Sequence, residues 1–154
     1  LRRVLDRAAV ALASEMVGGA QALLDSAVSY AKLRVQFGRL IGSFQAIKHK
    51  CADMLLAVEL AKSAAYGAAE AAAREASVDE LREAAALAKA LGAEAFLQAA
   101  ADTIQIHGGS GFTWENDTHL YFKRARGSEV LLGTPAAFRD RFVEYVSARE
   151  VAHE

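Results

Sequence analysis

Residues 104–117, with the sequence IQIHGGSGFTWEND, form the segment whose residue types are best suited to contact a ligand. Three glycines fall within four positions, and two aromatic residues stand beside them. Glycine has no Cβ, so its main chain can approach a ligand closely and can adopt angles that other residues avoid. A helix that only has to end needs a single glycine at its C-cap. The segment therefore indicates a binding loop, and an ordinary helix C-cap is the alternative.

The sequence lacks the familiar patterns of metal-dependent and nucleophilic catalysis. Its histidines are spread without metal-ligand spacing; they are His49, His107, His119 and His153. There is no Glu-x-x-His pair of the kind that builds a di-iron bundle, so we predict no metal site. The GGSG run is not followed by Gly-Lys-Ser/Thr and is not a P-loop. Ser110 has no evident base partner, which leaves nucleophilic catalysis unsupported.

The overall composition is that of a helical protein. Hydrophobic residues make up 53% of the 154 residues, alanine is abundant, and Pro135 is the only proline. The formal net charge of −1 gives no reason to expect nucleic acid as a partner. Charged residues interrupt every apolar run, so we expect no membrane span. The lone Cys51 favours a reducing, cytoplasmic location. The chain opens on Leu1 in helical pattern, without a signal peptide, so we expect a piece of a longer protein.

The spacing of apolar residues predicts an all-α, up-and-down antiparallel bundle of three long helices followed by two shorter ones. The expected helices are residues 1–36, a second helix from an N-cap at Ser43 to an alanine tract ending near residue 76, 77–107, 118–131 and 135–148. Residues 77–80 form a capping box. Gly133-Thr134-Pro135 gives a stop, a cap and a first-turn proline for the last helix. The long helices would each span roughly 45 Å.

Two apolar seams predict which helix faces are buried. In the second helix the seam consists of Ile47, Cys51, Met54 and Val58, so we interpret Cys51 as a core residue rather than a reactive thiol. In the third helix the buried stripe consists of Leu81, Ala84, Ala88, Leu91 and Ala95. The charged residues expected on the opposite face of that helix are Arg82, Glu83, Lys89 and Glu94.

Three stretches together resemble the C-terminal helical domain of the acyl-CoA dehydrogenases. They are YAKLRVQFGRLIGSFQAIKHKCADM (30–54), ALAKALGAEAFLQAAADTIQIHGGSGF (86–112) and HLYFKRARGSEVLLGT (119–134). Their order and separation match the family, so residues 1–154 are expected to form this one domain. The resemblance implies two further domains, one helical and one β, that this sequence does not contain. It also implies α,β-dehydrogenation of an acyl-CoA thioester, in which a carboxylate removes the α-proton and FAD accepts the β-hydride.

The resemblance also suggests what the glycine loop contacts. In the family this loop lies against the FAD of a neighbouring subunit, so Gly108 and Gly109 would let main chain reach the adenosine end of FAD. Gln105 would supply hydrogen bonds from the last helical turn. Arg34 matches the family arginine that meets the FAD pyrophosphate, whose oxygens a guanidinium can bind bidentately. The other implied cofactor-binding residues are Phe37, Gln45 and Thr134.

The sequence departs from the family where the catalytic base is expected. In many members the base is the glutamate of a Tyr-Glu-Gly-Thr loop, and here residues 131–134 read Leu-Leu-Gly-Thr, so Leu132 occupies that position. Other members carry the base on the first helix, at the position of Ala8, and the arginine that usually follows is Ala9. Ala136 replaces a flavin-binding glutamine. The implied substrate-binding residues are Asp6, near the CoA adenine, and Gly133.

Three interpretations remain open. We favour a base-lacking subunit paired with a related base-bearing chain, as in heteromeric dehydrogenases that act on steroid side-chain CoA thioesters. Alternatively, another carboxylate is the base, and Glu129 is the nearest, about one helical turn before Leu132. The third interpretation is a structural or oligomerisation module that binds no flavin.

The resemblance implies an assembly and a redox partner as well. The family forms a dimer of dimers through this domain, so we expect a homo- or hetero-tetramer. An electron-transfer flavoprotein is the redox partner that the family suggests. The alanine-rich helix faces suited to close subunit contact include Ala64, Ala65, Ala68 and Ala69.

Overall fold

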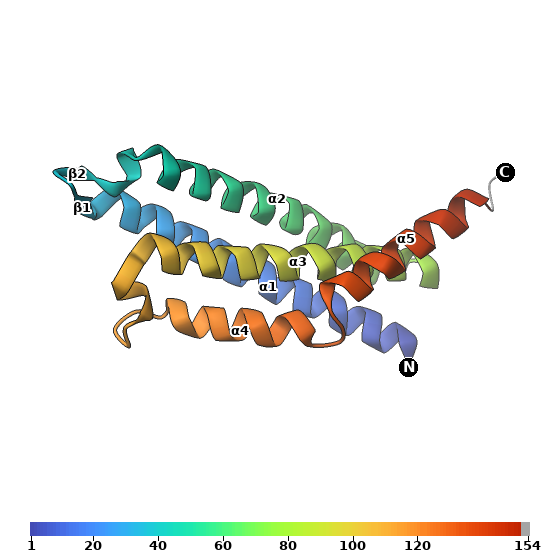
Figure 1. The fold of residues 1–154 in the computed structure, drawn as a ribbon. Coiled ribbons are helices and arrows are strands. Elements are labelled where there is room, and N and C mark those ends of the chain that lie inside the picture. The colour runs from blue at the N-terminus through green and yellow to red at the C-terminus, as the bar shows by residue number, and fades with distance from the viewer. Residues whose placement is uncertain (152–154) are drawn as a thin grey trace.

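The computed structural model, which describes residues 1–151, confirms the all-α fold class. Its helices are α1 (Arg2–Leu33), α2 (Gln45–Ala73), α3 (Val78–His107), α4 (Thr118–Val130) and α5 (Pro135–Val151). Helices α1 to α4 alternate in direction along the bundle, whereas α5 leaves the end of α4 and crosses the first half of α3 (Figure 1). Within residues 1–151 no helix is both long and apolar enough to span a bilayer.

The link between α1 and α2 differs from the prediction. Helix α1 ends at Leu33, and a small hairpin follows, made of β1 (Val35–Gln36) and β2 (Arg39–Leu40). The predicted helix to residue 36 was therefore wrong at its C-terminal end. Ser43 is not the N-cap of α2 either, because it belongs to the 3-10 turn Ile41–Ser43 and its hydroxyl donates to the Leu40 carbonyl at 2.7 Å. Two-residue strands give no periodic signal that could have predicted them.

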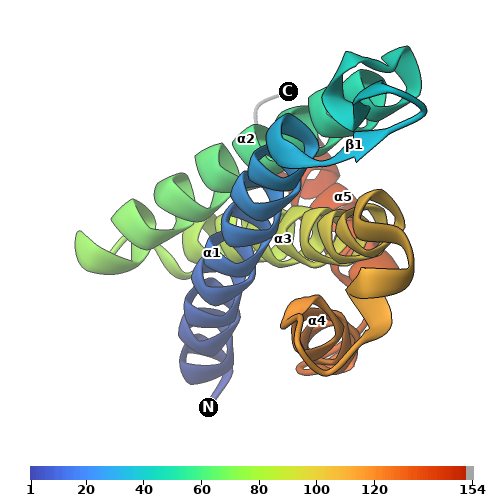
Figure 2. The same cartoon turned by 90° about the vertical axis from the view of Figure 1, so that its left-hand side faces the viewer.

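Helix α3 is the centre of the molecule and contacts the other four helices. Figure 2 shows α4 on the side of α3 that faces away from α2. The core combines many alanines with a few large side chains, of which Met16, Met54, Val58 and Phe96 are almost fully buried. Small residues allow close approach: a Cβ on Gly19 would lie 2.6 Å from the Phe96 ring. Close packing of this kind is what fixes the helices relative to one another.

The predicted seams agree with the structure, but one residue predicted on the opposite face of α3 is buried. In α2, Met54 and Val58 are fully buried, and Ile47 and Cys51 are partly buried against the same core. In α3, the predicted stripe is buried or partly buried along its length. Lys89, however, was predicted to face solvent and is 0% exposed. The prediction was wrong because α4 and α5 pack on the face of α3 that carries Lys89, and helical periodicity within α3 cannot reveal those neighbours.

Ser77 and Thr134 cap the two helix starts that the sequence predicted near the middle and end of the chain, but the predicted capping box at residues 77–80 is only half formed. The Ser77 hydroxyl accepts a hydrogen bond from the Glu80 amide at 3.2 Å. The Glu80 carboxylate pairs with Arg74 instead of completing the capping box. At α5 the Thr134 hydroxyl accepts from the Ala137 amide at 3.3 Å. These caps satisfy amides that have no partner inside the helix, which fixes where each helix begins.

Candidate functional site

The first group of predicted cofactor residues lies around the hairpin between α1 and α2. Arg34 directly follows α1 and is exposed, and Gln45, the first residue of α2, is exposed as well. The Gln45 amide nitrogen lies 3.4 Å from a ring nitrogen of His49. The Arg34 guanidinium forms no ion pair within the described residues. It is therefore available to bind an anion from outside the chain.

Phe37 sits at the tip of the hairpin in an unusual conformation. Its φ of 54° and the φ of 76° at Gly38 are the two positive angles that a tight type I′ hairpin turn needs. A bulky residue at positive φ is rare, and Phe37 is 90% exposed, with its ring in an edge-to-face arrangement with Phe44. A positive φ in a residue other than glycine costs about 1–3 kcal/mol, and an exposed ring gains little packing in return. Such a feature indicates that something outside the chain covers the ring.

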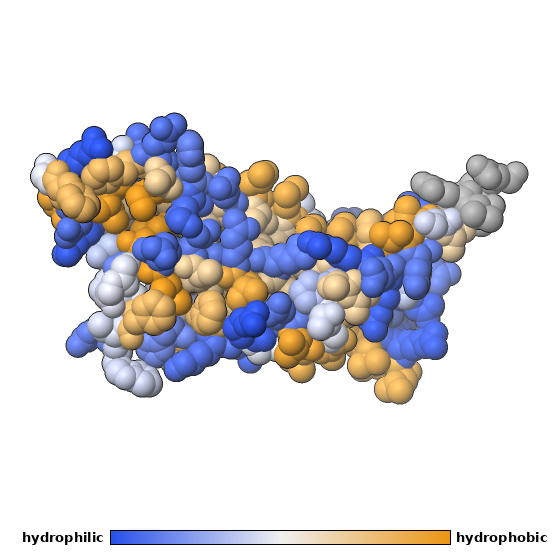
Figure 3. Space-filling view, in the orientation of Figure 1, coloured by the Kyte–Doolittle hydropathy of each residue, from blue (hydrophilic) through white to orange (hydrophobic). Residues whose placement is uncertain are grey.

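The second group lies at the end of α3, on the same end of the molecule. Gln105, Gly108 and Gly109 are exposed, and with Phe112 and Phe122 they line a hollow of about 500 Å³. Figure 3 shows apolar surface gathered over this end of the bundle, beside the hairpin. The glycine loop that the sequence singled out is therefore open to solvent and stands beside an apolar hollow.

The three neighbouring glycines of this loop have different roles. Gly108 ends α3 with φ 61° and ψ −138°, a combination that is essentially restricted to glycine. Gly111 is buried, and a Cβ there would lie 2.9 Å from the Ile104 carbonyl oxygen. Gly109 has an ordinary φ, and an added Cβ would meet nothing within 4 Å. The fold thus explains two of the glycines and leaves Gly109 without an internal reason.

Tyr30 joins the two groups, and the sequence argument missed it. Its ring stacks on His107 with centroids 4.2 Å apart, and its hydroxyl lies 3.5 Å from both the His107 carbonyl and the Ser110 hydroxyl. Tyr30 stands one helical turn before Arg34, so it ties the end of α1 to the glycine loop. Nothing in the local sequence predicts this contact, because the partners are about 77 residues apart.

The turn between α4 and α5 carries Leu132, the position where the resemblance places the catalytic base. Leu132 is partly buried with φ 66°, and Gly133 has φ 129°. Thr134 is exposed, with its hydroxyl occupied by the cap described above. Because the side chain at position 132 is apolar, the turn offers no proton acceptor of its own.

Two further residues that the sequence singled out adjoin this turn. The Glu129 carboxylate is held by Arg126 at 2.7 Å, so it would have to leave an ion pair to act as a base. The Glu129 carbonyl and the Gly133 carbonyl both accept from the buried Lys89 ammonium, at 3.2 and 3.3 Å. Burial lowers the pKa of Lys89 below its ordinary value, and the negative charge of Glu129 opposes that change. Sequence reasoning missed the role of Lys89.

Asp6 and the alternative base position lie at the start of α1. Ala8 is partly buried and Ala9 is buried, so neither offers a titratable group. Asp6 lines a hollow of about 390 Å³ together with Arg82 and Arg141. Burial raises the pKa of the Asp6 carboxyl, although the charge of Arg82, 3.7 Å away, acts in the opposite direction. One Asp6 oxygen is buried without a hydrogen-bond partner among the described residues.

The predicted site residues therefore fall into two groups at different places along the bundle. Gln105 and Lys89 are sixteen residues apart on α3, which corresponds to roughly 24 Å of helix. Thr134 and the turn lie with Lys89, whereas the hairpin and the glycine loop lie at the other end (Figure 1). Nothing in the fold brings Thr134 next to Arg34 or Gly109. A single chain therefore presents the two groups at separate places along α3.

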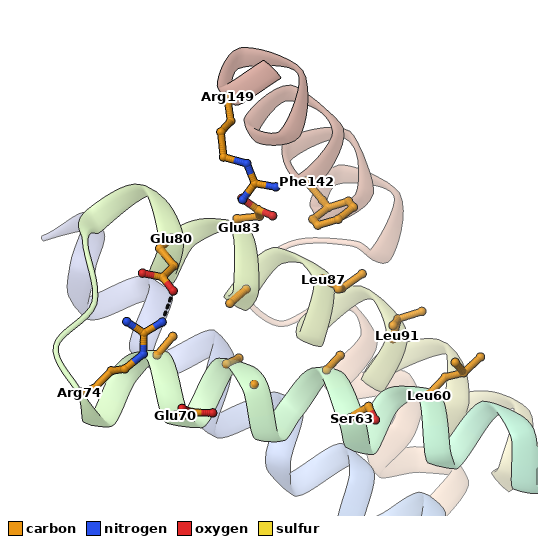
Figure 4. Close-up of a pocket in the computed structure, with 15 residues that line it drawn as sticks. Leu60, Ser63, Glu70, Arg74, Glu80, Glu83, Leu87, Leu91, Phe142 and Arg149 are labelled. Carbon is orange, nitrogen blue, oxygen red and sulfur yellow. Dashed lines mark hydrogen bonds and ion pairs between the residues drawn. The ribbon is translucent and has the colours of Figure 1, made fainter. Parts of the chain in front are cut away.

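A hollow of about 660 Å³ between α2, α3 and α5 contains none of the predicted site residues. Figure 4 shows Leu87, Leu91 and Phe142 along it, with Arg74 and Glu80 at one edge and Glu83 and Arg149 at another. These charged residues pair with each other rather than pointing free charges inward. The hollow is thus an apolar groove. Among the described residues there is also no cluster of histidine, cysteine and acidic side chains that could hold a metal ion.

Comparison with known proteins identifies the class to which this fold and site belong. The sequence model of the acyl-CoA dehydrogenase C-terminal domain matches residues 1–145. Acyl-CoA dehydrogenase FadE34 of Mycobacterium tuberculosis is 52% identical over 131 residues, which are 85% of this chain and 18% of that protein. The chain therefore belongs to the acyl-CoA dehydrogenase family, as a C-terminal domain of the dehydrogenase type.

Solved structures agree with this assignment. A variant of the steroid ACAD Tcur3481–Tcur3483 matches 98% of this chain and 41% of its own, with a TM-score of 0.90 and 32% identity. The ChsE4–ChsE5 complex of Mycobacterium tuberculosis matches 93% of this chain and 38% of its own, with a TM-score of 0.86 and 27% identity. The chain spans less than half the length of each of these proteins.

Proposed function

We propose that this chain is the C-terminal domain of a flavin-dependent acyl-CoA dehydrogenase and binds FAD across a subunit boundary. FAD, when bound, supplies the acceptor for the hydride that leaves the β-carbon of the acyl-CoA. The observation that supports this most is the open surface at the hairpin end. There Arg34 has no ion-pair partner within residues 1–151, Phe37 is exposed at positive φ, and an added Cβ on Gly109 would meet nothing within 4 Å. Tyr30 contacts the glycine loop from the end of α1.

The division of the predicted cofactor residues into two separate groups is consistent with this assignment. Arg34 and Gly109 at the hairpin end would hold the FAD of one subunit, and the turn containing Thr134 would adjoin a different FAD. Each part of the chain would then contact one cofactor without any need to bridge the roughly 24 Å between the groups. Arg34 would bind pyrophosphate oxygens, while the main chain at Gly109 would lie against the adenosine end.

The flavin proposal is tested by replacing Arg34 with alanine in the full-length protein. Loss of a charge-assisted contact of about 1.5 to 3 kcal/mol should weaken FAD retention by about 10-fold to 100-fold, measured as flavin absorbance per subunit after dialysis. Lys32→Ala, on the exposed last turn of α1, is the matched control and should keep its flavin. A wild-type protein that never carries flavin would favour the structural or oligomerisation module instead.

We further propose that this subunit lacks its own catalytic base. Leu132 cannot remove a proton, Ala8 and Ala9 are apolar, and Glu129 is already paired with Arg126. A related chain carrying a base would then complete one active site of a heteromeric pair. The similarity to the ChsE4–ChsE5 complex makes such a partner a reasonable first choice for a search. Either a fatty acyl or a steroid side-chain thioester would serve as substrate.

Glu129 remains the rival base within this chain. The test is Glu129→Ala in the subunit expressed alone. If the wild-type subunit turns over acyl-CoA and this change abolishes turnover with flavin retained, Glu129 is the base and the half-site proposal fails. Arg126→Ala, which frees the Glu129 carboxylate from its ion pair, is the companion variant and should then change the rate as well.

We propose a tetrameric assembly in the cytoplasm, with an electron-transfer flavoprotein as the electron acceptor. The alanine face suggested by the sequence has to be revised for this purpose, because Ala65 and Ala68 are buried inside the chain. Exposed side chains on α2, such as Leu56 (63% exposed) and Leu60 (54% exposed), are better suited to contact another subunit. Light scattering of the full-length protein tests the assembly, and a monomer at micromolar concentration would contradict it.

A further inference from the structure

Lys89 is completely buried, and its ammonium donates hydrogen bonds only to backbone carbonyls around the turn between α4 and α5, within the described residues. Its ammonium donates to the Glu129 carbonyl at 3.2 Å and to the Gly133 carbonyl at 3.3 Å. It also lies 5.3 Å from the centre of the Phe138 ring. Its ammonium has no carboxylate within ion-pair distance in the part of the chain that the structure describes. A buried charge of this kind is costly unless its hydrogen bonds are made, and here the turn supplies them.

The two carbonyls that Lys89 binds enclose the turn on both sides. The Glu129 carbonyl belongs to the last turn of α4, where backbone acceptors have no helical partner. The Gly133 carbonyl directly precedes Thr134, the cap of α5. Between them Leu132 is held at φ 66°, a strain that costs about 1–3 kcal/mol in a residue other than glycine and persists only when its surroundings impose it. Lys89 donates from a third helix to the carbonyls on both sides of this strained residue.

We propose that Lys89 is a positioning residue for acyl-CoA binding, because its ammonium fixes the turn of residues 131–134 that faces the substrate. The role rests on the proposed function, since that function is what places substrate at the turn. Lys89 cannot touch the substrate itself, because it is 0% exposed. It acts through the backbone: losing both hydrogen bonds would leave two carbonyls unsatisfied and allow Leu132 to relax to a negative φ.

The test compares Lys89→Met with a neighbouring control in the full-length protein in its native assembly. Methionine has a similar volume but no donors, so the helices should persist while the turn loosens. Hydrogen exchange at the amides of residues 132–134 should become roughly tenfold faster, and exchange at Gly108 and Gly109 should not change. Affinity for octanoyl-CoA or cholyl-CoA should fall roughly tenfold to 100-fold, with flavin content unchanged. A merely structural role would lower flavin content and thermal stability together with affinity.

Ser128→Ala is the matched control on the same stretch of α4. Ser128 is 1% exposed, and its hydroxyl has no partner among the described residues, so its loss should alter neither the turn nor affinity. If Lys89→Met does not fold, Lys89→Gln, which keeps two donors on a shorter side chain, should give a partial loss of affinity. Unchanged exchange or unchanged affinity in a folded variant would overturn the role of Lys89 alone. A wild-type protein that binds neither thioester would overturn the proposed function, and this role with it.

Discussion

At the scale of single residues, the fold itself requires glycine at positions 108 and 111, whereas only a bound ligand would require glycine at position 109. Gly109→Val should reduce FAD retention, because the branched side chain projects into open space where the cofactor would approach. The melting temperature should hardly change, since the added Cβ meets nothing within 4 Å. Flavin absorbance and thermal melting of the full-length variant measure the two effects. Retention of stoichiometric flavin would show that the adenosine end is not bound here.

The neighbouring glycines provide the comparison for that variant. Gly111→Val should lower the melting temperature strongly, because its Cβ would be 2.9 Å from the Ile104 carbonyl oxygen. Gly108→Val should cost about 1–3 kcal/mol of stability, because the backbone there occupies a region that other residues avoid. A stability loss at these two positions without one at Gly109 would confirm that the three glycines act differently.

At the scale of elements, an exposed ion pair between α1 and α4 should make their packing sensitive to acid. Glu15 accepts from Arg124 through both carboxylate oxygens, at 2.6 and 2.7 Å. The hydrogen bond from Arg124 lowers the pKa of the Glu15 carboxyl below its ordinary value of 4.5. A lowered pKa means that the stabilisation is complete above 4.5 and is lost as the pH falls through the folded-state pKa.

Thermal melting between neutral and acidic pH measures this effect. Glu15→Gln should lower the melting temperature slightly at neutral pH, with the difference from wild type vanishing once the pH is below the folded-state pKa. Glu59→Gln removes an ion pair with Lys62 inside α2 alone, so it serves as the control for loss of one charge. A difference at Glu15 that persists unchanged at low pH would contradict the assignment.

At the scale of the whole molecule, the proposed lack of a catalytic base in this subunit predicts how activity depends on assembly. The full-length subunit expressed alone should bind flavin but show little acyl-CoA dehydrogenation, because Leu132 is not a proton acceptor. Co-expression with a related base-bearing chain should restore turnover, with one competent site per heteromeric pair. Leu132→Glu in the lone subunit should give at most weak activity, since Ala9 on α1 stands where the resemblance places the arginine that accompanies the base. Full turnover by the lone subunit would contradict this reading.

The sequence by itself determined the family, the helices and most of their ends. Alanine-rich periodicity and the side-chain caps at Ser77 and Thr134 act between residues a few positions apart, so the local sequence contains them. The glycine loop and the apolar residue at position 132 were also evident without coordinates. The separation of the site residues into two distant groups was not, because it depends on how far apart the folded chain places them.

Only the tertiary structure decided which charged residue is buried and which turns are strained. The periodicity of α3 places Lys89 among the residues expected to face solvent. It is buried because α4 and α5 pack on that face, and its acceptors are carbonyls 40 and 44 residues further along the chain. The hairpin that presents Phe37, like the contact of Tyr30 with His107, left no periodic signal in the sequence. Helix formation depends mainly on residues that are near in the sequence, whereas the burial of a side chain depends on which distant segment packs against it. That is why the helices could be predicted and the surroundings of Lys89 could not.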